Sequence, residues 1–215
     1  MIRAFFGLET NPFAPEHVQL LAHQREILDT LMVHCQQGGL CLLIGEPGTG
    51  KTAIRAALAA ENPKNMIAPV LSRTLHTYSS VLKIICQACG VEALGNDYKC
   101  ERRLIDFAVN ANRTGKMLVP IIDDAHLMDI HCLRKLRLLF GEFPKNHNLI
   151  LTGQPCLLDT VRLSINDDIR SRVTYSAIVP KLTPDDAGAF ILVKSRALVV
   201  ECQSFLLDCD CIGSC

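Results

Sequence analysis

The chain has 215 residues, enough for one substantial core with a small appendage, and contains 22 basic and 22 acidic residues. Apolar residues make up 49%, which excludes a disordered chain, and the balanced charge provides no overall attraction for nucleic acid or membranes. No apolar run reaches the about 18 residues of a membrane-spanning helix, and the N-terminus lacks the apolar stretch of a signal peptide. We therefore expect a cytoplasmic protein whose eleven cysteines are reduced.

Short apolar runs alternate with longer amphipathic stretches, a pattern typical of α/β proteins. In chain order the pattern predicts strand 40–44, helix 51–60, strand 66–71, helices 78–89 and 97–112, strand 118–122, helix 132–140, strand 149–151, helix 154–163, strand 173–179 and helix 184–199. We expect the five strands to form one parallel sheet with helices on both faces. Residues 1–180 would form the main domain, 181–200 a small helical lid and 201–215 an atypical cysteine-rich tail.

The segment GEPGTGKT matches the P-loop (Walker A) pattern G-x-x-x-x-G-K-[ST] and lies between a predicted strand and a predicted helix. Its glycines let backbone N–H groups curl around phosphate oxygens, and the helix N-terminus adds partial positive charge. Lys51 is expected to reach the β- and γ-phosphates, and the Thr52 hydroxyl to bind magnesium. A chance glycine-rich turn of this pattern has a probability of about one in a hundred. The predicted ATP-binding residues are Gly45, Glu46, Pro47, Gly48, Thr49, Gly50, Lys51 and Thr52.

Two carboxylates, Asp123 and Asp124, follow the apolar strand 118–122. Strands often end in aspartate turns, so the pair is a weak signal in isolation. Following a P-loop, it is interpreted as the acidic Walker B pair. Asp123 is expected to hold magnesium directly or through water, and Asp124 to orient or deprotonate the attacking water. His126 is interpreted as a loop residue and not as a catalytic base.

Two further strands have polar residues at their ends. Thr152 at the end of strand 149–151 is a candidate sensor of the γ-phosphate or the attacking water, or alternatively a plain strand exit. Arg170 and Arg172 precede strand 173–179. Either these arginines pair with Asp167 and Asp168, or one of them is an arginine finger for the ATP of a neighbouring subunit.

The cysteines carry weaker signals. Cys86 and Cys89 share a helix face and are interpreted as buried residues, with a redox or metal role assigned a probability of about one in ten. The tail contains Cys202, Cys209, Cys211 and Cys215. Their spacing fits no familiar zinc site, so zinc receives about the same probability, and an aberrant terminus is the alternative.

Several of these segments together resemble one family. These are FFGL and NPF near the N-terminus, then GEPGTGKT, PIIDDAH, LRLLF, LILTGQP and IRSRV, in order, between residue 3 and about residue 199. They resemble the ExeA-like general secretion pathway protein A ATPases. The same AAA+ module is similar to the TniB-like and MuB-like transposition ATPases.

The resemblance implies a P-loop NTPase fold of the AAA+ type with a helical lid that is truncated here. It also implies Thr152 or Gln154 as sensor 1, Arg172 as the arginine finger, and Pro12 and Phe13 beside the adenine. The family usually has Glu where this chain has Asp124, and its lid usually continues to a G-x-P-R sensor 2 motif that this chain lacks. Nucleotide binding is therefore a firmer expectation than efficient hydrolysis.

The predicted function is that of an ATPase whose ATP-dependent oligomer engages DNA and a transposase. The lack of a membrane-spanning segment in this sequence favours that reading over secretion. The alternatives are the cytoplasmic ATPase module of a general secretion pathway assembly, and a hydrolysis-impaired scaffold that binds nucleotide.

Overall fold

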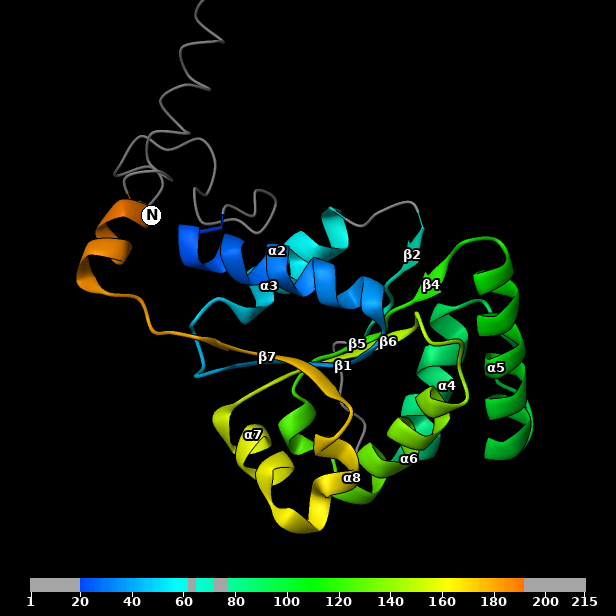
Figure 1. Cartoon of the computed structure of the whole chain (residues 1–215). Helices are drawn as coiled ribbons and strands as arrows, with labels where there is room; N and C mark the ends of the chain where they lie inside the picture. The colour runs from blue at the N-terminus through cyan, green and yellow to red at the C-terminus, as the bar shows by residue number, and fades with distance from the viewer. Residues whose placement is uncertain (1–19, 62–64, 72–76, 192–215) are drawn as a thin grey trace, which may run out of the picture. The chain divides into compact units, whose positions relative to one another are not determined.

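The computed structural model describes residues 20–61, 65–71 and 77–191. Residues Ala22–Lys181 form one compact unit, shown with its helices and strands in Figure 1. The chain ends form a second unit, of which only residues 20–21 and 182–191 are described. The predictions for Pro12, for Phe13 and for the cysteine-rich tail lie outside the described residues.

The helices are α2 (Ala22–Gln37), α3 (Lys51–Ala60), α4 (Tyr78–Ala88), α5 (Asp97–Arg113), α6 (Ile130–Gly141), α7 (Pro155–Arg162) and α8 (Asp167–Arg170), with 3-10 turns η1 (Ala125–Leu127) and η2 (Ser164–Asn166). The strands are β1 (Gly39–Gly45), β2 (Met66–Ile67), β3 (Val70–Leu71), β4 (Met117–Leu118), β5 (Ile121–Ile122), β6 (Asn148–Gly153) and β7 (Val173–Val179). None of the described helices is long and apolar enough to cross a membrane.

The main sheet has five strands in the order β3-β5-β6-β1-β7, and every neighbouring pair is parallel. Figure 1 shows α2 and α3 on one face of this sheet, and α4, α6 and α7 on the other. This arrangement confirms the predicted α/β fold with a five-stranded parallel sheet covered on both faces. Parallel strands need such cover because the crossover helices that join them must pack on the sheet.

Two of the predicted strands are each divided by a proline. Residues 66–71 contain β2 and β3, and residues 117–122 contain β4 and β5, so that β2 and β4 pair in a separate two-stranded sheet. The prediction of one continuous strand over 66–71 and another over 118–122 is wrong, because Pro69 and Pro120 have no N–H to donate to a ladder. The two segments stay hydrogen-bonded to each other across the prolines, since the N–H of Ile121 donates to the Pro69 carbonyl oxygen at 2.9 Å.

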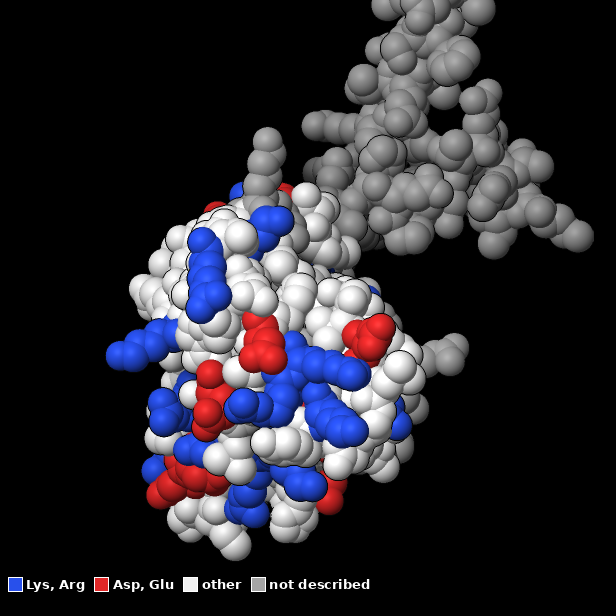
Figure 2. Space-filling view, turned by 90° about the vertical axis from the view of Figure 1, so that its right-hand side faces the viewer, with Lys and Arg blue, Asp and Glu red and all other residues white. Residues whose placement is uncertain are grey.

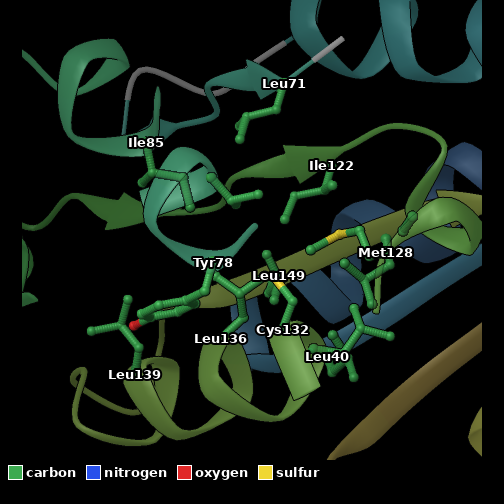
Figure 3. Packing of buried hydrophobic residues seen from close by; sticks show 14 of the residues in the cluster. Leu40, Leu71, Tyr78, Ile85, Ile122, Met128, Cys132, Leu136, Leu139 and Leu149 are labelled. Atoms are coloured by element: carbon green, nitrogen blue, oxygen red, sulfur yellow. The ribbon is translucent and has the colours of Figure 1, made fainter. Parts of the chain in front are cut away.

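The hydrophobic core depends on the alternation of side chains along β1. Leu40, Leu42 and Ile44 belong to one large buried cluster with residues of α4, α5, α6 and α7. Cys41 and Leu43 point to the opposite face, where α2 and α3 lie. Figure 3 shows the cluster and labels Leu40, Leu71, Tyr78, Ile85, Ile122, Met128, Cys132, Leu136, Leu139 and Leu149. Each fully buried leucine or isoleucine contributes about 1.5–3 kcal/mol relative to an exposed side chain.

Helix α2 is the longest element that the sequence analysis did not predict. Its buried residues are Gln24, Leu28, Leu31 and Cys35, which are spaced by four, three and four positions and so share one helix face. Only two of these four residues are large and aliphatic, which makes the apolar period weak in the sequence. Packing against α3, β1 and β7 supplies the stabilisation that the local pattern lacks.

The described part of the predicted lid is helical over residues 184–191. Thr183 caps this helix, because its hydroxyl accepts from the Asp186 N–H at 3.1 Å. The Asp186 carboxylate in turn accepts from the Thr183 N–H at 3.3 Å. This reciprocal pair is a capping box, which satisfies two N–H groups that a helix start would otherwise leave unpaired.

Two glycines with positive φ differ in what surrounds them. Gly38 (φ 78°) precedes β1, and a Cβ there would lie 1.8 Å from the Lys145 carbonyl oxygen. Gly115 (φ 72°) lies between α5 and β4, and a Cβ there would meet nothing within 4 Å. The backbone strain of an alanine is therefore the same at both positions, whereas the steric clash exists at Gly38 alone of the two.

We expect Gly115→Ala to lower the free energy of unfolding by about 1–2 kcal/mol, the cost of a left-handed alanine. Gly38→Ala should lower it by about 3 kcal/mol or more, because the backbone must also move. Urea denaturation of both variants measures the difference. Equal destabilisation would contradict the close packing of Gly38 against the loop that contains Lys145.

Candidate nucleotide-binding site

The P-loop connects the end of β1 to the start of α3, as the sequence predicts. Gly48 (φ 82°) and Gly50 (φ 95°) adopt left-handed conformations that glycine takes without strain. A Cβ at Gly48 would meet nothing within 4 Å, so the loop is open on that side. Thr49 is buried, and its hydroxyl donates to the Glu46 carbonyl oxygen at 3.0 Å. The Thr49 side chain thus closes one side of the loop, and the side at Gly48 is accessible.

The ammonium group of Lys51 lies over the loop. Its Nζ atom donates to the carbonyl oxygens of Gly45 and Glu46, both at 2.8 Å. Lys51 is also the first residue of α3, where the partial positive charge of the helix N-terminus adds to its own. The arrangement concentrates positive charge and N–H donors where the phosphates of a nucleotide would bind.

Gln24 supports the loop from α2, a role that the sequence analysis missed. Its side-chain Nε2 donates to the Thr49 carbonyl oxygen at 3.2 Å, and the residue is only 5% exposed. A Cβ on Gly50 would lie 2.3 Å from the same Nε2 atom, so Gly50 is needed for this close approach as well as for its φ angle. A polar residue inside the apolar stripe of α2 is the signal that could have identified it.

The carboxyl ends of β1, β5 and β6 lie side by side. β6 pairs with both other strands, with Thr152 opposite Leu43 and Leu151 opposite Ile122. Because parallel strands all end at one edge of the sheet, the P-loop after β1 and Asp123 after β5 meet at that edge. Thr152 lies between them on the intervening strand.

Both carboxylate oxygens of Asp123 have partners. Oδ2 forms an ion pair with Nη1 of Arg55, and Oδ1 accepts a hydrogen bond from the Thr152 hydroxyl. Oδ1 also accepts from the N–H of Asp124 at 3.1 Å. The side chains of Arg55 and Asp123 are 16% and 18% exposed, so this pair is largely shielded from water. The network holds Asp123 in one orientation at the carboxyl edge of the sheet.

Arg55 and Thr152 act on the same carboxylate from different elements. Arg55, on α3, was not among the predicted site residues, although it lies one helical turn after Thr52. Thr152, on β6, is 1% exposed and directs its hydroxyl to Asp123. Its contact therefore supports a role in positioning Asp123, and its predicted role as a phosphate sensor stays a prediction.

Asp124 has an unusual backbone conformation. Its φ of 50° is the one positive value among the described non-glycine residues. Aspartate and asparagine tolerate this left-handed region better than most residues. The Asp124 side chain is 55% exposed, and its Oδ1 atom lies 3.9 Å from Nδ1 of His126. The turn thus directs the second carboxylate of the pair toward solvent, whereas Asp123 is held inside.

Arg172 lies at the opposite end of the sheet from the P-loop. Its carbonyl oxygen accepts from the N–H of Leu40 at the start of β1, at 3.1 Å. The seven residues of β1 separate the two ends by about 20 Å, at about 3.3 Å per residue. Arg172 is exposed, and within the described residues its side chain has no ion pair. A finger role would therefore require the ATP of a second subunit.

The charges near Arg172 form a local network. Arg170 pairs with Asp167 at 3.0 Å, and Arg134 of α6 lies 3.7 Å from Asp168. The predicted pairing of the segment's arginines with Asp167 and Asp168 is therefore correct for Arg170 alone. The exposed Arg170–Asp167 pair contributes about 0–1 kcal/mol.

The donor atoms of this edge fit magnesium and a nucleotide. The Thr52 hydroxyl in the first turn of α3 and the Asp123 carboxylate are oxygen donors, which magnesium prefers. The loop N–H groups and the Lys51 ammonium group are the hydrogen-bond donors that bind phosphate oxygens. Thr52 and Asp123 therefore stay the predicted ligands of the metal, and their donor atoms fit it.

Of the two cysteines predicted to share a helix face, Cys86 in α4 is buried and Cys89 just after this helix is half-buried. Burial raises the pKa of Cys86 to about 11 and that of Cys89 to about 12, which keeps both thiols protonated at neutral pH. Cys86 donates to the Cys100 carbonyl oxygen at 3.8 Å, as a buried thiol does. Within the described ranges, no three His, Cys, Asp or Glu side chains are grouped to hold a metal ion.

Comparison with known proteins agrees with this geometry. A protein family described as "AAA domain" matches residues 33–161, more than half of the chain. The chain is also similar to general secretion pathway protein A of Aeromonas hydrophila, with 29% identity over 216 residues. That similarity covers 94% of this chain and 38% of the relative, so the chain spans less than two fifths of the relative's length. The predicted resemblance to that family is confirmed.

Solved structures share the fold. The ORC2 protein of Aeropyrum pernix, solved as ADPNP–ADP complexes, superposes with a TM-score of 0.66 at 14% identity, covering 90% of this chain and 55% of that one. CDC6P of Pyrobaculum aerophilum gives a TM-score of 0.65 at 16% identity, covering 86% and 53%. At such low identity these structures show the fold alone, and they confirm the predicted P-loop architecture.

We expect Lys51→Ala to weaken ATP binding by about 10- to 100-fold, because charge-assisted hydrogen bonds to phosphate are each worth about 1.5–3 kcal/mol. Isothermal titration with ATP and magnesium measures this loss. Lys99→Ala, which removes an exposed lysine of α5, is the control and should bind as the wild type does. Unchanged affinity in a folded Lys51→Ala variant would rule out the P-loop as the phosphate site.

Proposed function

Because the chain belongs to the AAA domain family, we propose that it is an ATPase that binds ATP with magnesium at the carboxyl edge of its sheet. In this proposal it hydrolyses ATP slowly and uses the nucleotide to control its assembly with further copies of itself. The observation that carries the proposal is the meeting of the P-loop, Asp123 and Thr152 at one edge.

Each residue at this edge has its own role in the proposed hydrolysis of ATP. The P-loop N–H groups and Lys51 bind the phosphates, and Thr52 with Asp123 holds the metal. Bound magnesium would withdraw charge from the phosphate oxygens. Asp124, directed toward solvent, would accept a proton from the attacking water. Thr152 keeps the Asp123 carboxylate oriented while this happens.

Slow turnover follows from the length of the second carboxylate. Aspartate is one methylene shorter than glutamate, so its oxygens reach about 1 Å less far, and a misplacement of about 1 Å can cost on the order of 10²-fold in rate. Binding relies on other groups and should be unaffected. If the remaining rate of ATP hydrolysis is negligible, the short Asp124 side chain instead supports the alternative of a scaffold that binds nucleotide without hydrolysing it.

The finer biological role is better supported for secretion than for transposition. General secretion pathway protein A of Aeromonas hydrophila is similar to this chain over 94% of its length. This similarity supports a role as the ATPase module of a secretion assembly. The role in transposition with DNA and a transposase, predicted from the sequence, has no support in the part of the chain that the structure describes. We therefore propose the secretion role.

The surface charge gives no specific argument for DNA. Figure 2 shows basic side chains across the face that α5 helps to form, with acidic side chains among them. Along α5, Lys99, Arg102, Arg103 and Arg113 alternate with Asp97, Glu101 and Asp106. A mixed surface of this kind lacks the single-sign field that draws a protein to a phosphate backbone.

A cytoplasmic location is part of the same proposal. The described cysteines are all free thiols, with no disulfide among them. Free thiols are usual in reducing compartments. ATP would be the small-molecule partner there, and further copies of the chain the protein partners.

We expect Asp124→Asn to keep ATP affinity within about twofold and to reduce turnover on the order of 10²-fold, because asparagine keeps the left-handed turn but cannot take a proton. Asp124→Glu should raise turnover, at some cost in stability, since glutamate tolerates that φ less well than aspartate. Phosphate release and titration calorimetry give the two quantities. Brisk wild-type hydrolysis that Asp124→Asn leaves unchanged would refute this role.

We expect Arg172→Ala to reduce turnover on the order of 10³-fold or more while ATP affinity stays unchanged, because a finger acts on the ATP of a neighbour. Mixing this variant with Lys51→Ala subunits should restore part of the activity at mixed interfaces. Arg170→Ala is the matched control, since Arg170 is also exposed but pairs with Asp167. If Arg170→Ala is as slow, or if mixing restores nothing, Arg172 is not a finger.

A further inference from the structure

Arg55 is a cation at the metal-binding side of the site that the proposed ATPase reaction does not use. It lies on α3, three residues after Thr52 and four after Lys51, so all three side chains project from neighbouring positions on that helix. Its guanidinium reaches across to β5 and contacts Oδ2 of Asp123. Both partners are more than four-fifths shielded from water, which makes their attraction stronger than that of a surface pair.

The contact engages the carboxylate that magnesium would need. Oδ1 of Asp123 already accepts hydrogen bonds from the Thr152 hydroxyl and the Asp124 N–H. Oδ2 is the oxygen that Arg55 holds. A metal ion that binds Asp123 directly must therefore share this oxygen with a guanidinium or displace it, and two cations at one carboxylate repel each other.

The sum of the charges at the site also indicates that Arg55 weakens metal binding. Lys51 and Arg55 supply two positive charges beside the phosphate site, and Asp123 and Asp124 supply two negative charges. Without Arg55 this set would carry one net negative charge, which opposes an incoming nucleotide anion and attracts a metal cation. Arg55 thus acts on ATP and on magnesium in opposite directions.

We propose that Arg55 is a resident counter-ion of Asp123 that lowers the magnesium affinity of the site and lets ATP bind with little help from the metal. The inference rests on the ATP site proposed above and adds a residue and a property to it. Arg55 is a positioning residue in this account, because it acts on phosphate and metal through Asp123 and through its charge.

The proposal predicts two changes of opposite sign in Arg55→Gln, which keeps a polar side chain but removes the charge. Binding of a fluorescent ATP analogue in EDTA should weaken on the order of tenfold, and binding of Mn²⁺ to the nucleotide-free protein should strengthen by about as much. A variant that is merely less well folded would weaken both. In the wild type, saturating magnesium should change the affinity for the analogue by less than about threefold.

The experiment has a metal arm and a nucleotide arm. Electron paramagnetic resonance counts free Mn²⁺ during a titration of the protein alone, and fluorescence anisotropy follows the ATP analogue in EDTA and in magnesium. Arg55→Lys keeps the charge and should stay within about threefold of the wild type in both arms. Arg25→Gln is the control, because it removes the exposed Arg25–Glu61 ion pair of 2.6 Å at the far end of α3 and should change neither affinity.

The outcomes separate two claims, the counter-ion role of Arg55 and the proposed ATP site. Equal Mn²⁺ affinity in the wild type and a folded Arg55→Gln variant would overturn the counter-ion role. So would a wild type whose affinity for the analogue rises tenfold or more with magnesium, a result that needs no variant. If the wild type bound no analogue at any magnesium concentration, the proposed ATP site would fail instead, and the metal arm would still judge Arg55 alone.

Discussion

The parallel pairing of β6 with both β1 and β5 is the constraint on which the site depends. It brings the P-loop, which follows β1, to the same edge as Asp123, which follows β5, although about 70 residues separate them in the sequence. It also places Thr152 between the two. The buried aliphatic side chains on either face of the sheet hold this pairing in register, because a shift of one residue would turn every core side chain toward the wrong face.

On that edge, one carboxylate connects three elements. Asp123 follows β5, accepts a hydrogen bond from Thr152 on β6 and forms an ion pair with Arg55 on α3. Since α3 begins at Lys51, any movement of this helix changes the surroundings of the Asp123 carboxylate. Breaking such a shielded pair is costly because it leaves a charge without a partner. In the proposed ATP site, the binding of nucleotide and the binding of metal are thereby linked through the side chain of Asp123.

Local sequence determined the chemistry and the fold class. The P-loop is a contiguous pattern, so its position between a strand and a helix could be predicted. The acidic pair after an apolar run and the alternation of strands and helices were visible for the same reason. Each signal comes from neighbours in the chain, and neighbours set backbone geometry and amphipathic period.

Contacts between distant segments could not be read from the sequence. Helix α2 depends on packing more than on its own pattern, and Gln24 reaches Thr49 only once α2 lies against the loop. The location of Arg172 at the far end of the sheet and the pairing of Arg55 with Asp123 both depend on how the strands are arranged. Sequence thus determined which groups are present, and tertiary structure decided which of them touch, because strand order is set by the burial of the whole core and not by any local pattern.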